Sequence, residues 1–291
     1  MVRPSILLAL GALAVAVTAC APASDTTQAA PSGTAGTPAA DACAKDNLAL
    51  KTPGTLTIGT DKPAYEPWFK DDDPANGKGF ESAVAHAVAK RLGFESGQVK
   101  WKTVKFDAAF APGAKQFDFD VNQVSATPER ARVVDFSKGY YTVKQAVVAM
   151  EGSPVASATD LAGLRDAKIG VQVGTTSLQA VKDVIRPSKD PNVYNEQIDA
   201  VNALKNKQVD AVVVDLPTAF YVTAAQIENS KIVGQFGSAS GTPEVFGAVF
   251  EKGSPLVGCV NKAIDELTAS GELAKIESEW LGSAAGAPEL K

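Results

Sequence analysis

Asp118-Phe-Asp-Val-Asn-Gln-Val-Ser-Ala-Thr-Pro-Glu-Arg130 is the stretch that decides the fold. Its apolar residues Phe119 and Val121 alternate with polar ones, which is the period of a strand with one buried face. Thr127 then suits a helix N-cap, and Pro128 suits the first helical position, where a missing N–H costs nothing. The pattern predicts a strand, a turn and a short helix.

A binding role for this turn depends on Arg130. In an open α/β sheet, ligands bind beyond the carboxyl ends of the strands. Arg130 would lie there, and its planar guanidinium can grip both oxygens of a ligand carboxylate. Ser125 and the turn amides could add donors. The alternative is a surface turn with a solvated Arg, and this stretch alone does not decide between the two.

A second strand–turn–helix pattern follows at Gly174-Thr-Thr-Ser177, after a predicted strand at 168–173. Free N–H groups and the positive end of a helix dipole would meet in that turn, which suits a carboxylate or a phosphate. It lacks the Lys of a Walker motif. A buried strand at 209–214 then ends at Asp215, which could cap the next helix or meet a ligand cation. An ordinary turn with a helix cap is the alternative for both.

Composition narrows the possible functions. The chain has 291 residues and a net charge of −5 with interspersed signs, without the basic stripe of a nucleic-acid-binding protein. The run Asp71-Asp72-Asp73 is followed by Pro74 and has no spaced partners, so we interpret it as a solvated loop and not as a calcium site. We expect no metal, no cofactor and no catalytic cluster.

The N-terminus predicts export. Residues 1–19 are expected to form a signal peptide, with Arg3 as its positive end and an apolar core at 6–17 that is short for a membrane span. Val17-Thr-Ala-Cys20 matches a lipobox, so we expect Cys20 to carry lipid and residues 20–44 to be a disordered tether. The alternative is an ordinary signal peptide with a chance Cys.

The run Ser125–Tyr141 resembles a segment of the polar-amino-acid-binding proteins of bacterial ABC transporters, which are extracellular solute-binding proteins of family 3. The family segment reads roughly S/T-x-T-x-E-R, then D-F-S and aromatics. Three further segments match in the family's order, at Asp61–Phe69, Gly79–Glu81 and Gly174–Thr176. The first of these has one residue more than the family loop. The resemblance covers about 48–281.

The resemblance implies an α/β fold of the periplasmic-binding-protein-like type II, with two lobes and a ligand cleft between them. The expected division is a signal peptide at 1–19, a lipidated Cys and tether at 20–44, a first part of lobe 1 at 45–143, lobe 2 at 144–245, and a second part of lobe 1 with the C-terminal helices at 246–291. Because the family returns these helices to lobe 1, Cys43 and Cys259 are expected to form a disulfide, as an even pair in an oxidising compartment. Two buried free thiols are the alternative.

The implied function is capture of a polar amino acid and its delivery to an ABC permease, by a monomer tethered to the outer face of the cell membrane. The ligand contacts that the resemblance implies are Asp61, Tyr65, Phe106, Gln123, Ser125, Arg130, Gln172, Thr175, Thr176 and Asp215. Of these, Arg130, Ser125 and the Thr176 turn would hold the α-carboxylate, Asp215 with Asp61 the α-ammonium, and Tyr65 and Phe106 would wall the side chain. The alternatives are a dehydratase-like enzyme, with Glu66 as a conceivable acid or base, and a ligand sensor for a surface receptor.

The lipobox carries the first prediction. Cys20→Ala removes the thiol that would be lipidated, so the variant should leave the membrane fraction for the soluble fraction or the medium. Fractionation followed by immunoblotting measures this. A variant that stayed membrane-bound at the wild-type level would contradict the lipid anchor.

Overall fold

The computed structural model describes residues 42–238, 241–282 and 286–291. The expected signal peptide, the expected lipidation site Cys20 and nearly all of the expected tether lie outside the described residues. Within them, the chain forms two five-stranded sheets and one two-stranded sheet.

The first sheet has the strand order β2-β1-β3-β12-β4. Its strands are β1 (Leu56–Thr60), β2 (Val99–Thr103), β3 (Phe119–Asp120), β4 (Val134–Phe136) and β12 (Val249–Glu251). β1 runs parallel to β2 and β3, whereas β12 runs antiparallel to β3 and β4. We call this sheet and its helices the first lobe; the helices are α1 (Phe80–Arg91), α2 (Phe106–Ala109), α6 (Leu256–Ala269) and α7 (Glu272–Leu281).

The second sheet has the strand order β10-β6-β9-β7-β8. Its strands are β6 (Gln145–Met150), β7 (Ile169–Gln172), β8 (Asn192–Tyr194), β9 (Ala211–Asp215) and β10 (Ser230–Phe236). With the helices α3 (Thr176–Ala180), α4 (Gln197–Lys205) and α5 (Leu216–Tyr221) it forms the second lobe. Short 3-10 turns lie at Lys45–Asn47, Lys70–Asp72, Pro74–Asn76, Ser96–Gln98, Arg130–Arg132 and Ala162–Leu164, and π-helical turns follow α3 and α5 at Val181–Ile185 and Val222–Gln226.

The central strands of the second lobe are buried on both faces. Along β9, Ala211 and Val213 belong to one apolar cluster, whereas Val212 and Val214 belong to another. Since successive side chains of a strand point to opposite faces, a strand covered on both sides has a continuous apolar sequence. This explains why the run at 209–214 lacks the alternation of a half-exposed strand.

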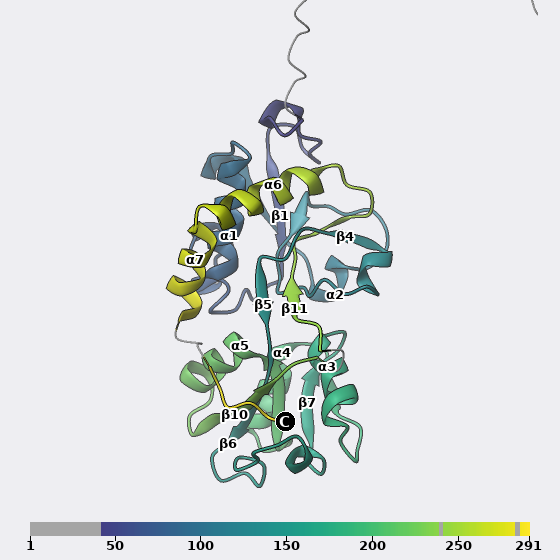
Figure 1. Cartoon of the computed structure of the whole chain (residues 1–291), viewed down its shortest axis with the longest axis vertical. Coiled ribbons are helices and arrows are strands. Elements are labelled where there is room, and N and C mark those ends of the chain that lie inside the picture. Colours follow the sequence, from purple (N-terminus) through teal and green to yellow (C-terminus); the bar gives the residue numbers. More distant parts are fainter. Residues whose placement is uncertain (1–41, 239–240, 283–285) are drawn as a thin grey trace, which may run out of the picture. The chain divides into compact units, whose positions relative to one another are not determined.

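Two antiparallel strands connect the lobes (Figure 1): β5 (Tyr141–Val143) and β11 (Glu244–Phe246), which pair Glu244 with Val143. The apolar run at 245–250 predicts a single return strand to the first lobe, but the structure divides it into β11 and β12 (Val249–Glu251). The chain leaves one sheet for another at Gly247, where a Cβ would lie 3.1 Å from the carbonyl oxygen of Ser137.

The C-terminal tail corrects the expected division of the chain. We expected all of 246–291 in the first lobe, and α6 and α7 do pack there. Leu290, however, lies in an apolar cluster of the second lobe, and its N–H donates to the carbonyl of Gln235 in β10. The tail thus covers the second sheet, because Leu290 finds an apolar surface over Gly234, whose missing Cβ would clash with it.

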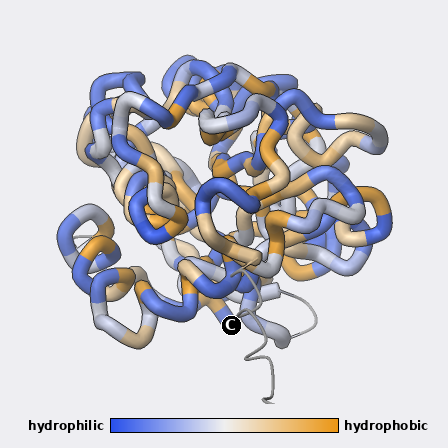
Figure 2. Tube along the Cα trace, turned by 90° about the horizontal axis from the view of Figure 1, so that it is seen from above, coloured by the Kyte–Doolittle hydropathy of each residue, from blue (hydrophilic) through white to orange (hydrophobic). Residues whose placement is uncertain are grey.

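Hydrophilic and hydrophobic residues alternate in short stretches along the trace (Figure 2). Accordingly, the described residues contain no helix that is both long and apolar enough to cross a membrane.

A disulfide joins Cys43 to Cys259 of α6, as the resemblance implied. It fixes the first described residues to the first lobe, and 216 positions separate the two cysteines. A crosslink over so long a loop restricts the unfolded chain strongly, which on chain-entropy arguments stabilises the fold by up to about 5 kcal/mol.

The disulfide carries the second prediction. Replacing both cysteines of the soluble domain by Ser should lower the free energy of unfolding by several kcal/mol, on the order of 2–5. Urea unfolding measures this, with the reduced wild type as the control, which should match the double variant. Thiol counting on the oxidised wild type should find no free thiol, and two free thiols would refute the bridge.

Candidate functional site

A cleft between the lobes collects eight of the ten ligand contacts that the resemblance implied: Asp61, Tyr65, Phe106, Gln123, Gln172, Thr175, Thr176 and Asp215. Ser125 and Arg130 do not line this cleft, and both are buried next to it. The sequence reasoning missed the other lining residues, which are Pro63, Ala64, Phe69, Asn122, Ser177, Glu196 and Gln197.

The strand ends position these side chains. β1 and β3 of the first lobe end before Asp61 and Gln123, and β7 and β9 of the second end at Gln172 and Asp215. The carboxyl ends of parallel strands meet at one edge of a sheet, and here the two edges face the same cleft.

Asp215 supplies a carboxylate from the second lobe. It is partly buried, and its Oδ1 accepts a hydrogen bond of 3.0 Å from the side-chain amide of Gln145. Burial, then the nearby Glu244 carboxylate, raises the pKa of Asp215 well above its usual value. A carboxyl group in this position would be stabilised in its charged form by a cation in the cleft.

Arg130 supplies a positive charge from the first lobe. It is only 8% exposed, and its guanidinium donates to the carbonyls of Ser125 (2.9 Å) and Gly174 (2.8 Å). The guanidinium carbon lies 4.2 Å from the centre of the Phe110 ring and 5.6 Å from that of Phe106. Burial lowers the pKa of Arg130 to about 10, so the group stays charged at neutral pH.

The turn that Arg130 contacts begins α3. The Thr175 hydroxyl accepts from the N–H of Leu178 at 3.1 Å and donates to the carbonyl of Gln172 at 2.8 Å. Thr175 is thus the N-cap of α3, so this turn contains the helix cap that the sequence left open as the alternative. The Gly174 carbonyl is bound by Arg130, so the first lobe fixes the second lobe's turn directly.

An acidic group lies at another part of the cleft. Asp61 accepts from the N–H groups of Lys62 (2.7 Å) and Phe106 (3.1 Å). Burial, and to a lesser degree the charge of Glu196, raises the pKa of Asp61. Burial and the same Glu196 raise the pKa of Tyr65 to about 12.

Glu81, a buried acid behind the cleft, positions Gln123. The sequence analysis gave Glu81 no role in the site. Glu81 of α1 accepts from the Gln123 N–H at 2.7 Å, from the Gln123 side-chain amide, and from the Tyr140 hydroxyl at 2.5 Å. Gln123 has a positive φ of 50°, a conformation that few residues other than Gly adopt, and these contacts hold it there. Burial raises the pKa of Glu81 to about 7 against these hydrogen bonds.

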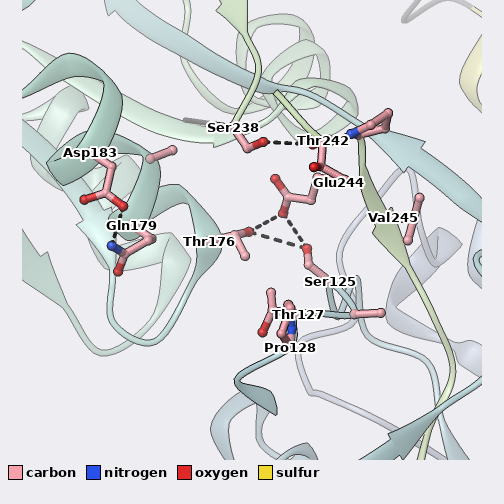
Figure 3. A pocket seen from close by; sticks show the side chains of 13 residues that line it. Ser125, Thr127, Pro128, Thr176, Gln179, Asp183, Ser238, Thr242, Glu244 and Val245 are labelled. Atoms are coloured by element: carbon pink, nitrogen blue, oxygen red, sulfur yellow. Dashed lines mark hydrogen bonds between the residues drawn. The ribbon is translucent and has the colours of Figure 1, made fainter. Parts of the chain in front are cut away.

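Glu244 of β11 is the second acid that sequence reasoning missed. Its Oε1 accepts from the hydroxyls of Ser125 (2.5 Å) and Thr176, and Figure 3 shows the carboxylate between them. Its Oε2 accepts from the Gln145 amide at 3.1 Å. One carboxylate of the crossing strand β11 thus links the two lobes. In the sequence, Glu244 stands out only as an acidic residue directly before the apolar run at 245–250.

The acids near the cleft do not form a metal site. In the part of the chain that the structure describes, no three or more His, Cys, Asp or Glu side chains are placed to hold a metal ion.

Comparison with known proteins gives concordant matches. The chain matches the sequence profile of the bacterial extracellular solute-binding proteins, family 3, over residues 56–283. A probable histidine-binding protein of Campylobacter jejuni subsp. jejuni is 34% identical over 227 residues, which cover 75% of this chain and 81% of that protein.

Solved structures agree with this. An ancestral arginine-binding protein bound to glutamine matches with a TM-score of 0.67 and 34% identity, over 79% of this chain and 99% of that one. The ancestral amino acid-binding protein AncCDT-1, a precursor of cyclohexadienyl dehydratase, matches with a TM-score of 0.64 and 30% identity, over 78% and 95%. The fold is therefore the two-lobed type II fold that the resemblance implied.

The raised pKa of Glu81 carries the third prediction. Because folding raises this pKa from 4.5 to about 7, the contribution of Glu81 to stability is present below pH 4.5 and is lost as the pH rises through 7. Glu81→Gln removes this titration, so the variant should gain stability relative to the wild type between pH 5 and pH 8.

Urea unfolding at several pH values measures this difference. Glu279→Gln, at an exposed position of α7, serves as the control and should show no such trend. If the stability difference between Glu81→Gln and the wild type were constant from pH 5 to pH 8, the buried charge of Glu81 would not be the cause.

Proposed function

Because the chain belongs to the bacterial extracellular solute-binding proteins of family 3, we propose that it captures a polar amino acid outside the cell membrane and delivers it to an ABC permease. One observation carries the proposal. Asp215 of the second lobe brings a carboxyl group to the cleft, and Arg130 of the first lobe brings a positive charge to its wall. An α-amino acid carries an ammonium and a carboxylate a few ångströms apart, so it can satisfy both.

In this proposal the α-ammonium binds Asp215. The pKa of Asp215 is raised chiefly because water is excluded, and an ammonium would restore the stability of its charged form. A charge-assisted hydrogen bond of this kind is about twice as strong as a neutral one.

The α-carboxylate would then face Arg130 and the turn that begins α3. The N–H groups of Thr176 and Ser177 lie in the first turn of that helix, where helix geometry provides no partner within the helix. Arg130 lies behind the turn and adds charge. The hydroxyls of Ser125 and Thr176 donate to Glu244, and each has only one proton. Their protons are therefore engaged with Glu244, and in this proposal these hydroxyls are not the carboxylate donors that we first expected.

The ligand side chain would lie toward Asp61, Tyr65 and Phe106. Asp61 and Glu196 both line this part of the cleft, and two acids there would favour a side chain with positive charge. We propose an amino acid with a basic or strongly polar side chain. Similarity to proteins named for histidine and arginine supports the same class.

The proposed place of action is the outer face of the cell membrane, with lipid on Cys20 as the anchor. Binding by both lobes would stabilise their closed arrangement, because the ligand contacts both lobes only there. That arrangement is what an ABC permease would recognise. A sensor for a surface receptor would use the same contacts, and a permease and ATPase encoded beside this chain would favour transport.

A dehydratase-like enzyme is the second candidate, and the similarity to AncCDT-1 is the observation that favours it. Such an enzyme needs an acid or base in the cleft. Glu66, which the sequence suggested for this role, does not line the cleft. We propose binding without turnover, and recovery of the amino acid unchanged after long incubation would support it.

The two charged ends of the ligand carry the fourth prediction. A thermal-shift screen of the twenty amino acids first identifies the ligand, since saturation at about a hundred times Kd adds about 2.7 kcal/mol. Arg130→Ala and Asp215→Ala should then each weaken binding roughly 100- to 1,000-fold, because each leaves a ligand charge unpaired at about 3–5 kcal/mol. Calorimetry measures both.

Crossed analogues separate contact from damage to the fold. Methyl esterification of the ligand should reduce its affinity for the wild type strongly and its affinity for Arg130→Ala much less. N-acetylation should likewise reduce affinity for the wild type strongly and affinity for Asp215→Ala much less. Arg132→Ala and Asp190→Ala change exposed residues of the same kind and should bind as the wild type does. Equal losses for both analogues in both variants would show that these residues do not act on the two charged ends of the ligand as proposed.

A further inference from the structure

Gln145 joins two carboxylates through one nitrogen. Its Nε2 donates to Asp215 at 3.0 Å and to Glu244 at 3.1 Å, and its Oε1 accepts from the Ser177 hydroxyl at 2.6 Å. The Ser177 contact fixes which end of the amide faces the acids. Gln145 itself is fully buried.

Two acids so close together do not ionise independently. The amide between them is neutral and cannot compensate a second negative charge. With little water available, the first charge raises the free energy of the second, and the two groups titrate as a coupled pair. One proton on the pair relieves the repulsion.

The hydrogen bonds decide which acid keeps the proton. Glu244 accepts from Ser125, Thr176 and Gln145, and donors of this kind stabilise a charged carboxylate. Among the described residues, only Gln145 donates to the carboxyl group of Asp215. The charge therefore belongs on Glu244 and the proton on Asp215, in agreement with the raised pKa of Asp215.

Other charged and titratable groups act on this pair from the surrounding elements. Glu81 of α1 is a further negative charge that raises the pKa of Asp215, and Arg130 opposes it. Tyr141 of β5 has its own pKa raised, mainly by burial, and stays neutral. Asp183, beyond α3, lines the pocket on the Glu244 side (Figure 3) and is exposed.

We propose that Glu244 is a specificity-determining residue of the ammonium site: its charge adds to the burial of Asp215 in keeping Asp215 protonated, and the ammonium group of the amino acid displaces that proton on binding. This inference rests on the proposed function. In the step, the O–H bond of Asp215 breaks, its electron pair stays on the carboxylate, and the proton passes to the buffer. The ammonium keeps its own three protons. A ligand without a positive charge at this position leaves Asp215 neutral and gains no ion pair. Such a ligand therefore binds more weakly than one with an ammonium group.

Calorimetry in two buffers tests the proposal. L-Arginine and L-glutamine are the probes, and the tighter binder is used; L-histidine is left out because its imidazole titrates in the same range. Titrations at pH 7 in phosphate and in imidazole give the number of protons released per ligand bound. The wild type should release close to one proton. Its affinity should rise roughly tenfold per pH unit at pH values where free Asp215 is protonated.

Three variants assign the proton. Glu244→Gln keeps the size of the side chain and removes its charge, so proton release should fall to less than about half and the pH dependence should flatten. Asp215→Asn should abolish the release, which separates Asp215 from Glu81 as its source. Asp183→Asn, in the pocket on the Glu244 side, serves as the control and should release as many protons as the wild type.

The outcomes that overturn the proposal are distinct from those that overturn the proposed function. Tight binding by the wild type without proton release, or full release by Glu244→Gln, would refute the proposal and leave the amino-acid-binding function standing. If none of the twenty amino acids binds, both fail. Should Glu244→Gln not fold, infrared difference spectra of the wild type remain decisive. Ligand must remove a protonated-carboxyl band that Asp215→Asn lacks, and an unchanged spectrum would refute the proposal.

Discussion

The cleft depends on the buried guanidinium of Arg130. Its two hydrogen bonds join a carbonyl of the first lobe to a carbonyl of the second, and the Phe110 ring covers it. Removing a guanidinium from water is unfavourable unless its N–H groups are satisfied, so the group makes the two turns that it binds interdependent. The same burial leaves a positive charge with little solvent around it, and that charge acts to lower the pKa of the nearby Asp215.

Three acids near the cleft, namely Glu81, Asp215 and Glu244, all accept hydrogen bonds from side chains, but their donors differ. Glu81 is fully buried, Asp215 and Glu244 are partly buried, and each is held by side-chain donors from another segment. Glu81 fixes the left-handed Gln123, while Glu244 fixes two hydroxyls on opposite lobes. The lobes are also joined by the Trp68 indole, which donates to Thr218 of α5 at 3.0 Å and packs against Phe246 of β11. The Trp68 contacts thus connect the loop at 61–69 to the crossing strand β11 and to the second lobe.

Much of the fold could be predicted because its signals are local. The predicted strands at 118–121, 168–173 and 209–214 correspond to β3, β7 and β9. The Thr127 hydroxyl accepts from the N–H of Arg130 at 3.2 Å, but the expected helix is only the 3-10 turn Arg130–Arg132, and its N-cap is Glu129. The cysteine pair was predictable from parity and compartment once the family topology was assumed. The return strand was harder, because a continuous apolar run does not show where a chain passes from one sheet to another.

The partly predicted site shows what a single sequence lacks. Asp215 and the Thr176 turn could be identified from the sequence, because each is a polar feature directly after a predicted buried strand. Glu244 and Gln145 lie 99 positions apart, and neither has a neighbour in the sequence that suggests its partner. Their meeting follows from the antiparallel pairing of β5 with β11, which pairs Glu244 with Val143, two positions before Gln145. The contacts that set the charge state of a site between lobes are therefore consequences of topology, and a sequence pattern reveals them only after the crossing strands have been paired.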